Sequence, residues 1–480
     1  MHYGDRPMLI GGKLSFGNNP EWITSLNPST EEEIGRVPAG TAYDVMHATE
    51  AARLAQPAWA ALTIWERGAK LRALAAAIRV RAEEVRAMEA ADGGLTIGNL
   101  GNDLHKASNH FEYFAGLMSE IKGETMSSLS SGMHMTTRVP YGVVGRIVPF
   151  NHPFMFATAN LAPPLAAGNT VVLKSPETSP LTATIVAEIC AEVLPAGVVN
   201  IVSGYGLPVG DTIARHPQIR RIGFTGSIAT GLAIQRAAAE KTVKHITLEL
   251  GGKNPLIVFP DADPEKAADA AIAGMNFAWA GQSCGSTSRI LAHESVANRV
   301  TARLAERLAA IRVGDASDPA SQMGPLNSAA HRDRVHALVA KGREEARLVI
   351  GGAAPQGAAF QRGYWMAPTL FADVEPGMTI ACEEVFGPVM TVQRWSNVED
   401  MIAIANHSEY GLTASLFTND LTTALTTARA LEAGVTHING SRMHFVGAPF
   451  GGVKNSGIGG EECLEELLSY TEVRTLHISL

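Results

Sequence analysis

Cysteine is scarce in this chain of 480 residues, which contains only Cys190, Cys284, Cys382 and Cys463. Four scattered cysteines are too few for a disulfide scaffold and lack the paired spacing of cysteine metal sites. The 15 histidines also lack the spacing of metal ligands, so we expect no metal site. Lys and Arg number 39 against 47 Asp and Glu, a formal net charge of −8. A chain without a basic block is a poor candidate for binding a phosphate backbone, so nucleic acid is not an expected partner.

Long uninterrupted apolar runs are also missing. The longest apolar stretch, residues 154–173, contains Pro163, Pro164 and Gly168, which favour a buried helix and strand over a membrane-spanning helix. The first residues lack the basic end and apolar run of a secretory signal. We therefore expect a protein of a reducing compartment, the cytoplasm, with no membrane partner. Its length and its hydrophobic share of 46% indicate a globular chain of two or three domains.

Helix-period segments alternate with short β-branched runs from about residue 143 to residue 439, which is typical of parallel α/β architecture. A first series predicts strands at 143–150, 170–174, 198–202, 221–225 and 245–251, with helices from Phe154, over 181–194 and from Ile228. A second series predicts strands at 254–259, 388–395, 413–417 and 436–439, with helices over 264–280 and 295–311. Two series imply two lobes with a seam near residues 251–253.

The N-terminal third is predicted to be mostly helical. The segment 70–91 is rich in Ala, Leu, Arg and Glu and predicts one helix that ends at Gly93-Gly94. The serine-rich segment 126–137 is either a loop or an exposed hairpin, because periodicity alone does not distinguish the two.

Three short motifs place chemistry-bearing residues where predicted strands end. GFTGS (223–227) joins a strand to a helix, so its amides and the Ser227 hydroxyl could hold a phosphate, although a plain helix cap fits equally well. In KSPE (174–177), Glu177 could bind ribose hydroxyls and so favour NAD over NADP, although the segment alone is merely a turn. ELGGK (249–253) presents Glu249 beside two glycines, either facing a cleft or held in a salt bridge.

Cys284, in the turn GQSC (281–284), has polar neighbours and is the best candidate among the cysteines for a reactive thiol. Most isolated cysteines are buried apolar residues, and Cys190, inside an amphipathic segment, is expected in the core. The cluster Gly204, Gly206 and Gly210 fits the dinucleotide fingerprint poorly and is interpreted as a plain turn.

The order of seven segments gives these motifs a common meaning: PFNHP (149–153), KSPE, GFTGS, ELGGK, GQSC, EEVFGPV (383–389) and PFGGVKNSG (449–457). Together they resemble the aldehyde dehydrogenase superfamily over nearly the whole chain. The resemblance implies an α/β fold with a Rossmann-like cofactor domain (1–119 and 141–252), an α/β catalytic domain (253–462) and a small β oligomerisation element (120–140 and 463–480). It also implies a homodimer or homotetramer.

The same resemblance implies a role for each motif residue. Cys284 is then the nucleophile, Glu249 the general base, and Asn151 the donor to the oxyanion, together with the backbone amide of Cys284. The implied cofactor is NAD, with NADP possible, and its contacts are Lys174 and Glu177 at the adenosine ribose, Ser227 at the pyrophosphate, and Glu384 and Phe386 at the nicotinamide ribose and ring. The residue types suit the chemistry, because a thiolate attacks the carbonyl, amide donors hold the oxyanion, and a carboxylate activates water.

The sequence departs from the family pattern at a few positions. Gly460 stands where the family commonly has an arginine, His152 where a large aromatic is common, and Ala278 where a bulky residue is common. The loop NGSRMHFVGA (439–448) resembles the substrate loop of aromatic aldehyde dehydrogenases. We expect substrate contacts from His152, Met155, Trp279, Arg442, His444 and Phe445, with room left by Ala159 and Ala278 and stacking by Phe154.

These features predict NAD-dependent oxidation of an aldehyde, aromatic or bulky, to the carboxylate through a cysteine thiohemiacetal and thioester. The small-molecule aldehyde is the expected partner. A betaine-aldehyde-type or semialdehyde substrate is the alternative, since the same aromatic residues would form a cage for a quaternary amine. A CoA-acylating relative is disfavoured by Glu249, and a non-catalytic structural relative by the presence of all three catalytic residues.

Overall fold

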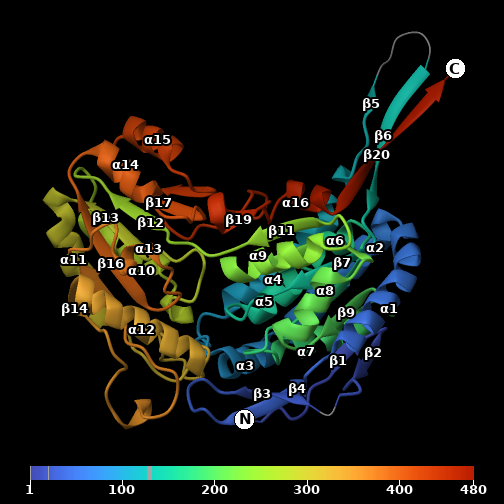
Figure 1. The fold of residues 1–480 in the computed structure, drawn as a ribbon, viewed down its shortest axis with the longest axis horizontal. Coiled ribbons are helices and arrows are strands. Elements are labelled where there is room, and N and C mark those ends of the chain that lie inside the picture. The colour runs from blue at the N-terminus through green and yellow to red at the C-terminus, as the bar shows by residue number, and fades with distance from the viewer. Residues whose placement is uncertain (1, 20, 127–131, 480) are drawn as a thin grey trace.

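The computed structural model describes residues 2–19, 21–126 and 132–479. Figure 1 shows two lobes side by side, the first built mainly from N-terminal residues in blue to green and the second from later residues in yellow to orange. A narrow arm projects from the first lobe and carries the C-terminus. No helix within the described ranges is long and apolar enough to cross a membrane.

The first lobe is built around an eight-stranded sheet in the order β19-β11-β10-β7-β8-β9-β1-β2. Five of its strands are parallel to one another: β7 (Val143–Ile147), β8 (Thr170–Lys174), β9 (Val199–Val202), β10 (Ile219–Thr225) and β11 (His245–Glu249). Antiparallel strands complete its two edges, namely β1 (Met8–Ile10), β2 (Lys13–Ser15) and β19 (Gly457–Ile458). Along β8, Val171 and Leu173 belong to one apolar cluster and Val172 to another, so both faces of the sheet are covered.

The second lobe holds a seven-stranded sheet in the order β14-β15-β16-β13-β12-β17-β18. Its strands are β12 (Pro255–Val258), β13 (Arg289–His293), β14 (Arg347–Ile350), β15 (Thr369–Ala372), β16 (Val389–Trp395), β17 (Thr413–Phe417) and β18 (Val435–Ile438). All neighbours are parallel except β14, which runs antiparallel to β15. The two sheets confirm the predicted α/β fold class.

Helices pack against the two sheets. Those before the seam are α1 (Ala42–Ala61), α2 (Ile64–Val80), α3 (Ala82–Gly93), α4 (Gly101–Leu117), α5 (Pro153–Ala159), α6 (Ala162–Ala166), α7 (Thr182–Val193), α8 (Asp211–Arg215) and α9 (Ile228–Ala239). Those after it are α10 (Pro264–Gly274), α11 (Glu294–Ala309), α12 (Ala329–Glu345), α13 (Thr379–Cys382), α14 (Val398–Asn406), α15 (Leu421–Ala430) and α16 (Leu464–Ser469). A separate antiparallel pair, β3 (Trp22–Leu26) and β4 (Glu33–Pro38), lies near the N-terminus.

The arm is a three-stranded antiparallel sheet in the order β20-β6-β5. Its strands are β5 (Thr125–Met126), β6 (Gly132–Pro140) and β20 (Thr471–Ser479). The serine-rich segment falls partly in this arm, where Thr125 pairs with Met135, while its residues 127–131 lie outside the described part of the chain.

Two predicted helices are shorter than expected. The segment 70–91 forms two helices, because Arg81 leaves helical dihedral angles (φ −90°, ψ 7°) and its guanidinium pairs with Glu84 and with Glu188 of α7. The predicted end at Gly94 is correct, and its φ of +75° is one that glycine adopts without strain. The predicted helix 264–280 ends at Gly274, because Asn276 and Ala280 adopt left-handed angles that turn the chain toward Cys284.

The strand order of the first sheet reverses beside β7. From β7 the chain adds β8 and β9 on one side, and then returns to add β10 and β11 on the other. Ligands of open parallel sheets bind at such a switch point, beyond the carboxyl ends of the strands. The loops after β7 and β10 contain Asn151 and Ser227, so two predicted motifs meet at this edge.

Candidate active site

A cavity of about 810 Å³ lies at this switch point. Its lining includes all eight residues expected in catalysis and cofactor binding: Asn151, Lys174, Glu177, Ser227, Glu249, Cys284, Glu384 and Phe386. Five of them follow strands of the first sheet, whereas Cys284, Glu384 and Phe386 come from loops of the second lobe. The cavity is therefore shared by the two lobes.

Cys284 lies in a tightly packed turn. Gly281 has a φ of +70°, and a Cβ there would stand 2.4 Å from the carbonyl oxygen of Gly387, so only glycine fits. Burial raises the pKa of the Cys284 thiol to about 12, with further contributions from the Glu384 and Glu249 carboxylates. The thiol is thus protonated in this environment, and attack on a carbonyl requires that its proton be removed.

Asn151 reaches across to the loop that carries the cysteine. Its buried carboxamide donates through Nδ2 to the main-chain oxygen of Gln282, at 3.0 Å. Gln282 is itself fixed, because its side chain donates to the Trp279 oxygen and accepts from the Asn327 amide, each at 3.0 Å. A carboxamide nitrogen carries two hydrogens, so one remains for an oxyanion near Cys284.

Glu249 ends β11 between two strands, opposite Thr225 of β10 and Gly457 of β19. Its side chain is buried, and Oε2 has no hydrogen-bond partner among the described residues. Burial and the neighbouring carboxylates of Glu461 and Glu466 raise its pKa well above the usual value. A buried carboxylate of raised pKa suits a general base that works near neutral pH.

One end of the cavity can hold a ribose and a phosphate. Lys174 Nζ donates to Glu177 Oε2 at 2.9 Å, which fixes the carboxylate just beyond β8. Ser227 caps α9, where its Oγ accepts from the Thr230 amide at 3.3 Å, and it also lines the cavity. The helix cap is confirmed, and the place of Ser227 in the cavity lining leaves its contact with a phosphate as a prediction. Gly206 and Gly210 also line the cavity, and Gly210 lies beside Lys174. The sequence did not predict this position, because their segment matches the glycine fingerprint poorly.

At the other end, Glu384 and Phe386 are held by α12. Glu384 accepts from the Gly252 amide at 2.9 Å, and burial raises its pKa to about 7. His331 of α12 contacts the Phe386 oxygen at 2.7 Å, and Arg334 donates to the main-chain oxygen of Glu384 at 2.8 Å. His331 and Arg334 also line the cavity. Sequence reasoning missed both, since α12 carries no motif that links it to the EEVFGPV segment.

Asn254 is a second residue that the motifs did not reveal. Its Nδ2 donates to the main-chain oxygens of Cys284, at 2.7 Å, and Ser286, at 2.9 Å, while its Oδ1 accepts from the Thr413 amide at 3.0 Å. One buried side chain thus fixes the backbone of the cysteine turn. Its only signal in the sequence is its place directly after ELGGK.

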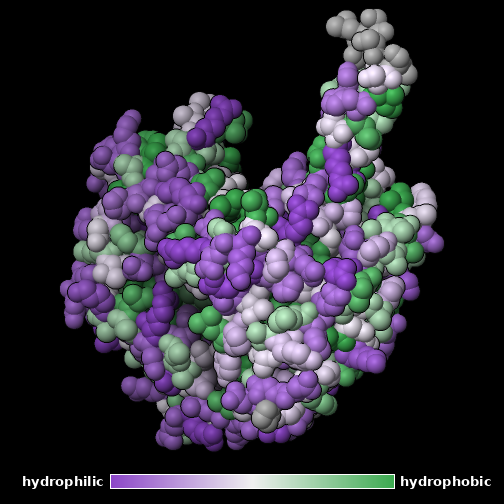
Figure 2. Space-filling model, turned by 45° about the vertical axis from the view of Figure 1, so that its right-hand side comes forward, coloured by the Kyte–Doolittle hydropathy of each residue, from purple (hydrophilic) through white to green (hydrophobic). Residues whose placement is uncertain are grey.

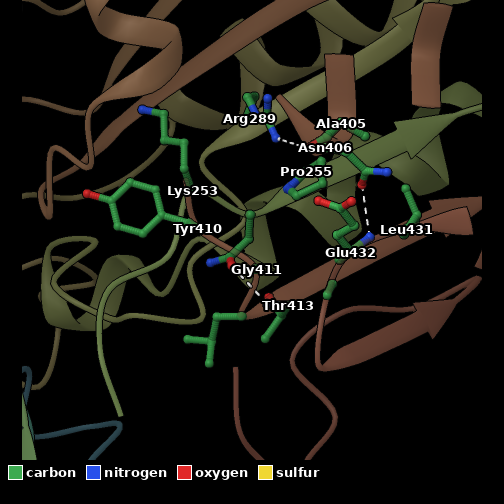
Figure 3. A pocket seen from close by; sticks show the side chains of 14 residues that line it. Lys253, Pro255, Arg289, Ala405, Asn406, Tyr410, Gly411, Thr413, Leu431 and Glu432 are labelled. Atoms are coloured by element: carbon green, nitrogen blue, oxygen red, sulfur yellow. Dashed lines mark hydrogen bonds between the residues drawn. The ribbon is translucent and has the colours of Figure 1, made fainter. Parts of the chain in front are cut away.

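Figure 3 shows a much smaller cavity, of about 10 Å³, that Lys253, Asn254 and Pro255 of the same segment help to line. Lys253, Arg289 and Tyr410 line it, and burial together with the positive charge of Arg289 lowers the pKa of Lys253 to about 7. The space matches a single water molecule, so it is too small for an aldehyde.

Two of the residues expected to contact substrate, His152 and Trp279, pack together with ring centroids 4.9 Å apart. Met155 is buried on the same helix turn as His152. Phe154 is fully buried in the core of the first lobe and Ala159 is 5% exposed there, so the expectation that Phe154 stacks on a substrate ring is wrong. The period of α5 turns that side chain inward.

The remaining expected substrate residues lie on the loop after β18. His444 contacts the carboxylate of Glu462 at 3.5 Å and stacks on Phe450. Arg442 is exposed and donates to the main-chain oxygen of Ala273 at 3.2 Å, and Phe445 is 77% exposed. These side chains therefore border the molecule's surface rather than its interior.

The model of the aldehyde dehydrogenase family matches residues 16–476. This chain belongs to that family. It is 44% identical over 464 residues to aldehyde dehydrogenase tropH of Talaromyces stipitatus, covering 95% of this chain and 90% of the relative. Hydroxyisobutyraldehyde dehydrogenase of Mycolicibacterium austroafricanum is 40% identical over 474 residues, covering 98% and 94%.

Solved structures of aldehyde dehydrogenases share the fold. A putative aldehyde dehydrogenase from Burkholderia cenocepacia superposes with a TM-score of 0.96 at 40% identity, covering 98% of this chain and 97% of the other. An NAD⁺ complex of an aldehyde dehydrogenase from Bacillus cereus superposes with a TM-score of 0.96 at 35% identity, covering 99% and 97%. The chain is an NAD(P)-dependent aldehyde dehydrogenase, and the predicted family, reaction and cofactor are confirmed.

The residues of this aldehyde dehydrogenase fit a dinucleotide. The cavity is long enough to reach from the Lys174–Glu177 pair to Cys284, and the start of α9 supplies amides beside Gly226 and Ser227. Apolar side chains line the cavity near α9, where a flat adenine would be sheltered: Phe224, Ala229, Ala233, Ile234 and Ala237.

Proposed function

We propose that this enzyme oxidises its aldehyde by covalent catalysis at Cys284 and releases the acid by hydrolysis. The observation that carries the proposal is the convergence of Cys284, Asn151 and Glu249 on one cavity that also fits the cofactor. We also propose three units with the bounds inferred from the sequence: 1–119 with 141–252 for the cofactor, 253–462 for catalysis, and 120–140 with 463–480 for association. Within the second unit, β19 pairs with β11 and so extends the sheet of the first.

In the first half of the reaction, the Cys284 sulfur bonds to the carbonyl carbon as the thiol proton passes to the Glu249 carboxylate, which returns it to solvent before the second half. The free hydrogen of the Asn151 carboxamide and the Cys284 amide donate to the oxygen that becomes negative. Bound NAD would supply the hydride acceptor beside that carbon, with Glu384 and Phe386 at its nicotinamide end, and loss of the hydride would leave a thioester on Cys284. Lys174 and Glu177 anchor the cofactor at its ribose, and the fixed Glu177 carboxylate repels a 2′-phosphate, which favours NAD over NADP.

In the second half, Glu249 takes a proton from water, which attacks the thioester carbon. The carbon–sulfur bond then breaks, so that the acid leaves and the thiolate is restored. The unpartnered Oε2 of Glu249 is free to accept that proton. A hydrolytic rather than CoA-dependent release follows from this carboxylate.

We further propose an aromatic or bulky aldehyde as the substrate. Ala278 is a small residue where the family commonly has a bulky one, and His152 and Trp279 place two aromatic rings, tilted by 36°, near the cysteine turn. One relative is named for hydroxyisobutyraldehyde, a branched aldehyde. A bulky substrate for this chain is compatible with that name. The chain itself would act as a homodimer or homotetramer in the cytoplasm, and its four unpaired cysteines fit a reducing compartment.

Substitution of Cys284 tests the proposal. Cys284→Ala is expected to bind NAD yet to release no NADH from benzaldehyde or acetaldehyde, whereas the matched Cys190→Ala, in a buried core position, keeps turnover. NADH release is measured by absorbance with NAD, with NADP, and with and without CoA. Near-normal turnover by Cys284→Ala, or turnover only with CoA, would contradict the mechanism. The wild type should favour benzaldehyde over acetaldehyde in kcat/KM.

A further inference from the structure

A set of polar side chains from α4, the segment after Asn151 and the C-terminal region is joined by short contacts: Asp103, Lys106, His152, His444 and Glu462. Two of them, Asp103 and Lys106, lie one turn apart on α4, and each has a partner from a distant segment. Lys106 pairs with Glu462, whose other carboxylate oxygen contacts His444 at 3.5 Å. The positive charge of Lys106 acts to lower the pKa of the Cys284 thiol against the larger effect of burial, so α4 lies within electrostatic reach of the nucleophile.

His152 is held in this set by Asp103. Its Nδ1 lies 2.7 Å from Asp103 Oδ2, and its side chain is 15% exposed. The imidazole ring packs against two aromatic rings, Trp279 with a centroid distance of 4.9 Å and Phe156 with a centroid distance of 5.9 Å. Among the described residues, no group makes a hydrogen bond to its Nε2. Because the two ring nitrogens point in nearly opposite directions, Nε2 faces away from Asp103.

His152 lies next to the catalytic residues but outside the lining of the cofactor cavity. It directly follows Asn151, which lines that cavity with Cys284. Its neighbour Trp279 starts the turn that ends at Cys284. For an aldehyde whose carbonyl lies between Asn151 and Cys284, His152 is the side chain next to Asn151 in the chain, packed on Trp279, that could meet the end pointing away from the cofactor.

We propose that His152, oriented by Asp103, determines specificity by forming a hydrogen bond with a hydroxyl group on the aldehyde. This inference rests on the proposed function, because it assumes that Cys284 and Asn151 bind the carbonyl. The imidazole is fixed at Nδ1 in the manner of a carboxylate–histidine pair, so its Nε2 offers one oriented site to a hydroxyl.

The surrounding charges select a neutral hydroxyl rather than an anion. The ammonium of Lys106 is already paired with Glu462, and Asp103 stands directly behind the imidazole. An anionic substituent would therefore meet two carboxylates without a free cation among these side chains. An apolar substituent would cover Nε2 and leave it without water or a partner, which is unfavourable.

Two pairs of aldehydes that differ by hydroxyl against methyl test the inference. They are 2-hydroxypropanal with 2-methylpropanal, and 3-hydroxybenzaldehyde with 3-methylbenzaldehyde. In the wild type, the hydroxyl member of at least one pair should have a kcat/KM about tenfold higher or more, because a site built to bind a hydroxyl discriminates against its absence.

In His152→Phe this ratio should fall to about one, because the preference for the hydroxyl member is lost, and His152→Gln, which retains a donor and an acceptor, should keep part of the preference. Asp103→Asn should reduce the ratio, since Asp103 is a positioning residue and touches no substrate atom. His105→Phe, on the exposed side of α4, is the matched control and should match the wild type.

A wild-type ratio near one in both pairs, or an unchanged ratio in His152→Phe, would overturn the inference while leaving the proposed function intact. Failure of the wild type to oxidise any of the four aldehydes would instead contradict the proposed function and this inference together. NAD binding measured by fluorescence shows for each variant that the cofactor lobe is folded.

Discussion

At the scale of single residues, burial controls the reactivity of the site. Cys284 and Glu249 are both removed from water, and each carboxylate in the cavity makes ionisation of the next group less favourable. The pKa of both groups therefore lies above the ordinary value. Because each acts in its deprotonated form, the rate should rise with pH across the neutral range, and acid should suppress it.

Glu249→Gln tests the base directly. Acylation can still proceed with solvent as the acceptor of the thiol proton, but water is no longer deprotonated, so NADH should appear as a burst equal to the number of active sites followed by a slow steady state. The steady-state rate should also lose its rise with pH. Stopped-flow absorbance over a series of pH values around neutrality measures both effects. Glu399→Gln, at an exposed position of α14, is the control, and an unchanged steady state in Glu249→Gln would reject the assignment.

At the scale of elements, a buried arginine joins the central strand of the first sheet to the C-terminal segment. Arg146 of β7 is 1% exposed and donates to Tyr470 Oη at 2.8 Å and to Glu461 Oε1 at 2.9 Å. A Cβ at Gly223 would stand 2.0 Å from the Arg146 guanidinium, so the neighbouring strand must carry glycine there. Glu461 follows Gly460, the position where the family commonly has an arginine.

This contact predicts a graded loss of stability. Arg146→Ala leaves the Glu461 carboxylate without its partner and should lower the free energy of unfolding by about 3 kcal/mol or more. Tyr470→Phe removes one hydrogen bond and should cost about 1 kcal/mol. Urea unfolding followed by fluorescence compares the two. An Arg146→Ala variant as stable as Tyr470→Phe would show that the buried pair does not hold these elements together.

At the scale of the whole molecule, the arm has too little surrounding structure to bury its own apolar side chains. Met133, Val473, Leu476 and Ile478 are each more than 40% exposed on it. Figure 2 shows hydrophobic side chains in green along the projecting arm. Within the described residues, the outer edge of β20 pairs with no strand, nor does the outer edge of β18 in the second sheet. Free edges and exposed apolar residues together favour association with a second copy.

The arm therefore predicts the oligomeric state. The wild type should elute as a dimer or tetramer, and the double substitution Val473→Asp with Leu476→Asp should yield a smaller species, because charge on both positions opposes burial between copies. Light scattering coupled to size exclusion measures the mass. Val80→Asp, at an 84% exposed position on α2, is the matched control. A monomeric wild type, or an arm variant of unchanged mass, would contradict the prediction.

The sequence by itself determined the fold class, the family and the motif residues. Strand ends such as Lys174, Thr225 and Glu249 could be placed because their local pattern shows where a buried strand stops, and parallel strands bring those stops to one edge. Local pattern also located the C-cap at Gly94. It did not reveal the break at Arg81, where the guanidinium pairs with Glu188 of α7, because the segment is rich in residues that favour helix and the partner lies far along the chain.

Only the tertiary structure decided which residues support the site. Asn254 bonds to Cys284 30 positions away, Asp103 to His152 49 positions away, and Lys106 to Glu462 356 positions away. No periodicity or motif links such partners, since each pair meets through the packing of separate elements. The same packing turned Phe154 into the core and left His152 beside Trp279. Residue type at a strand end is a local property, whereas the partner of a side chain is a property of the folded chain.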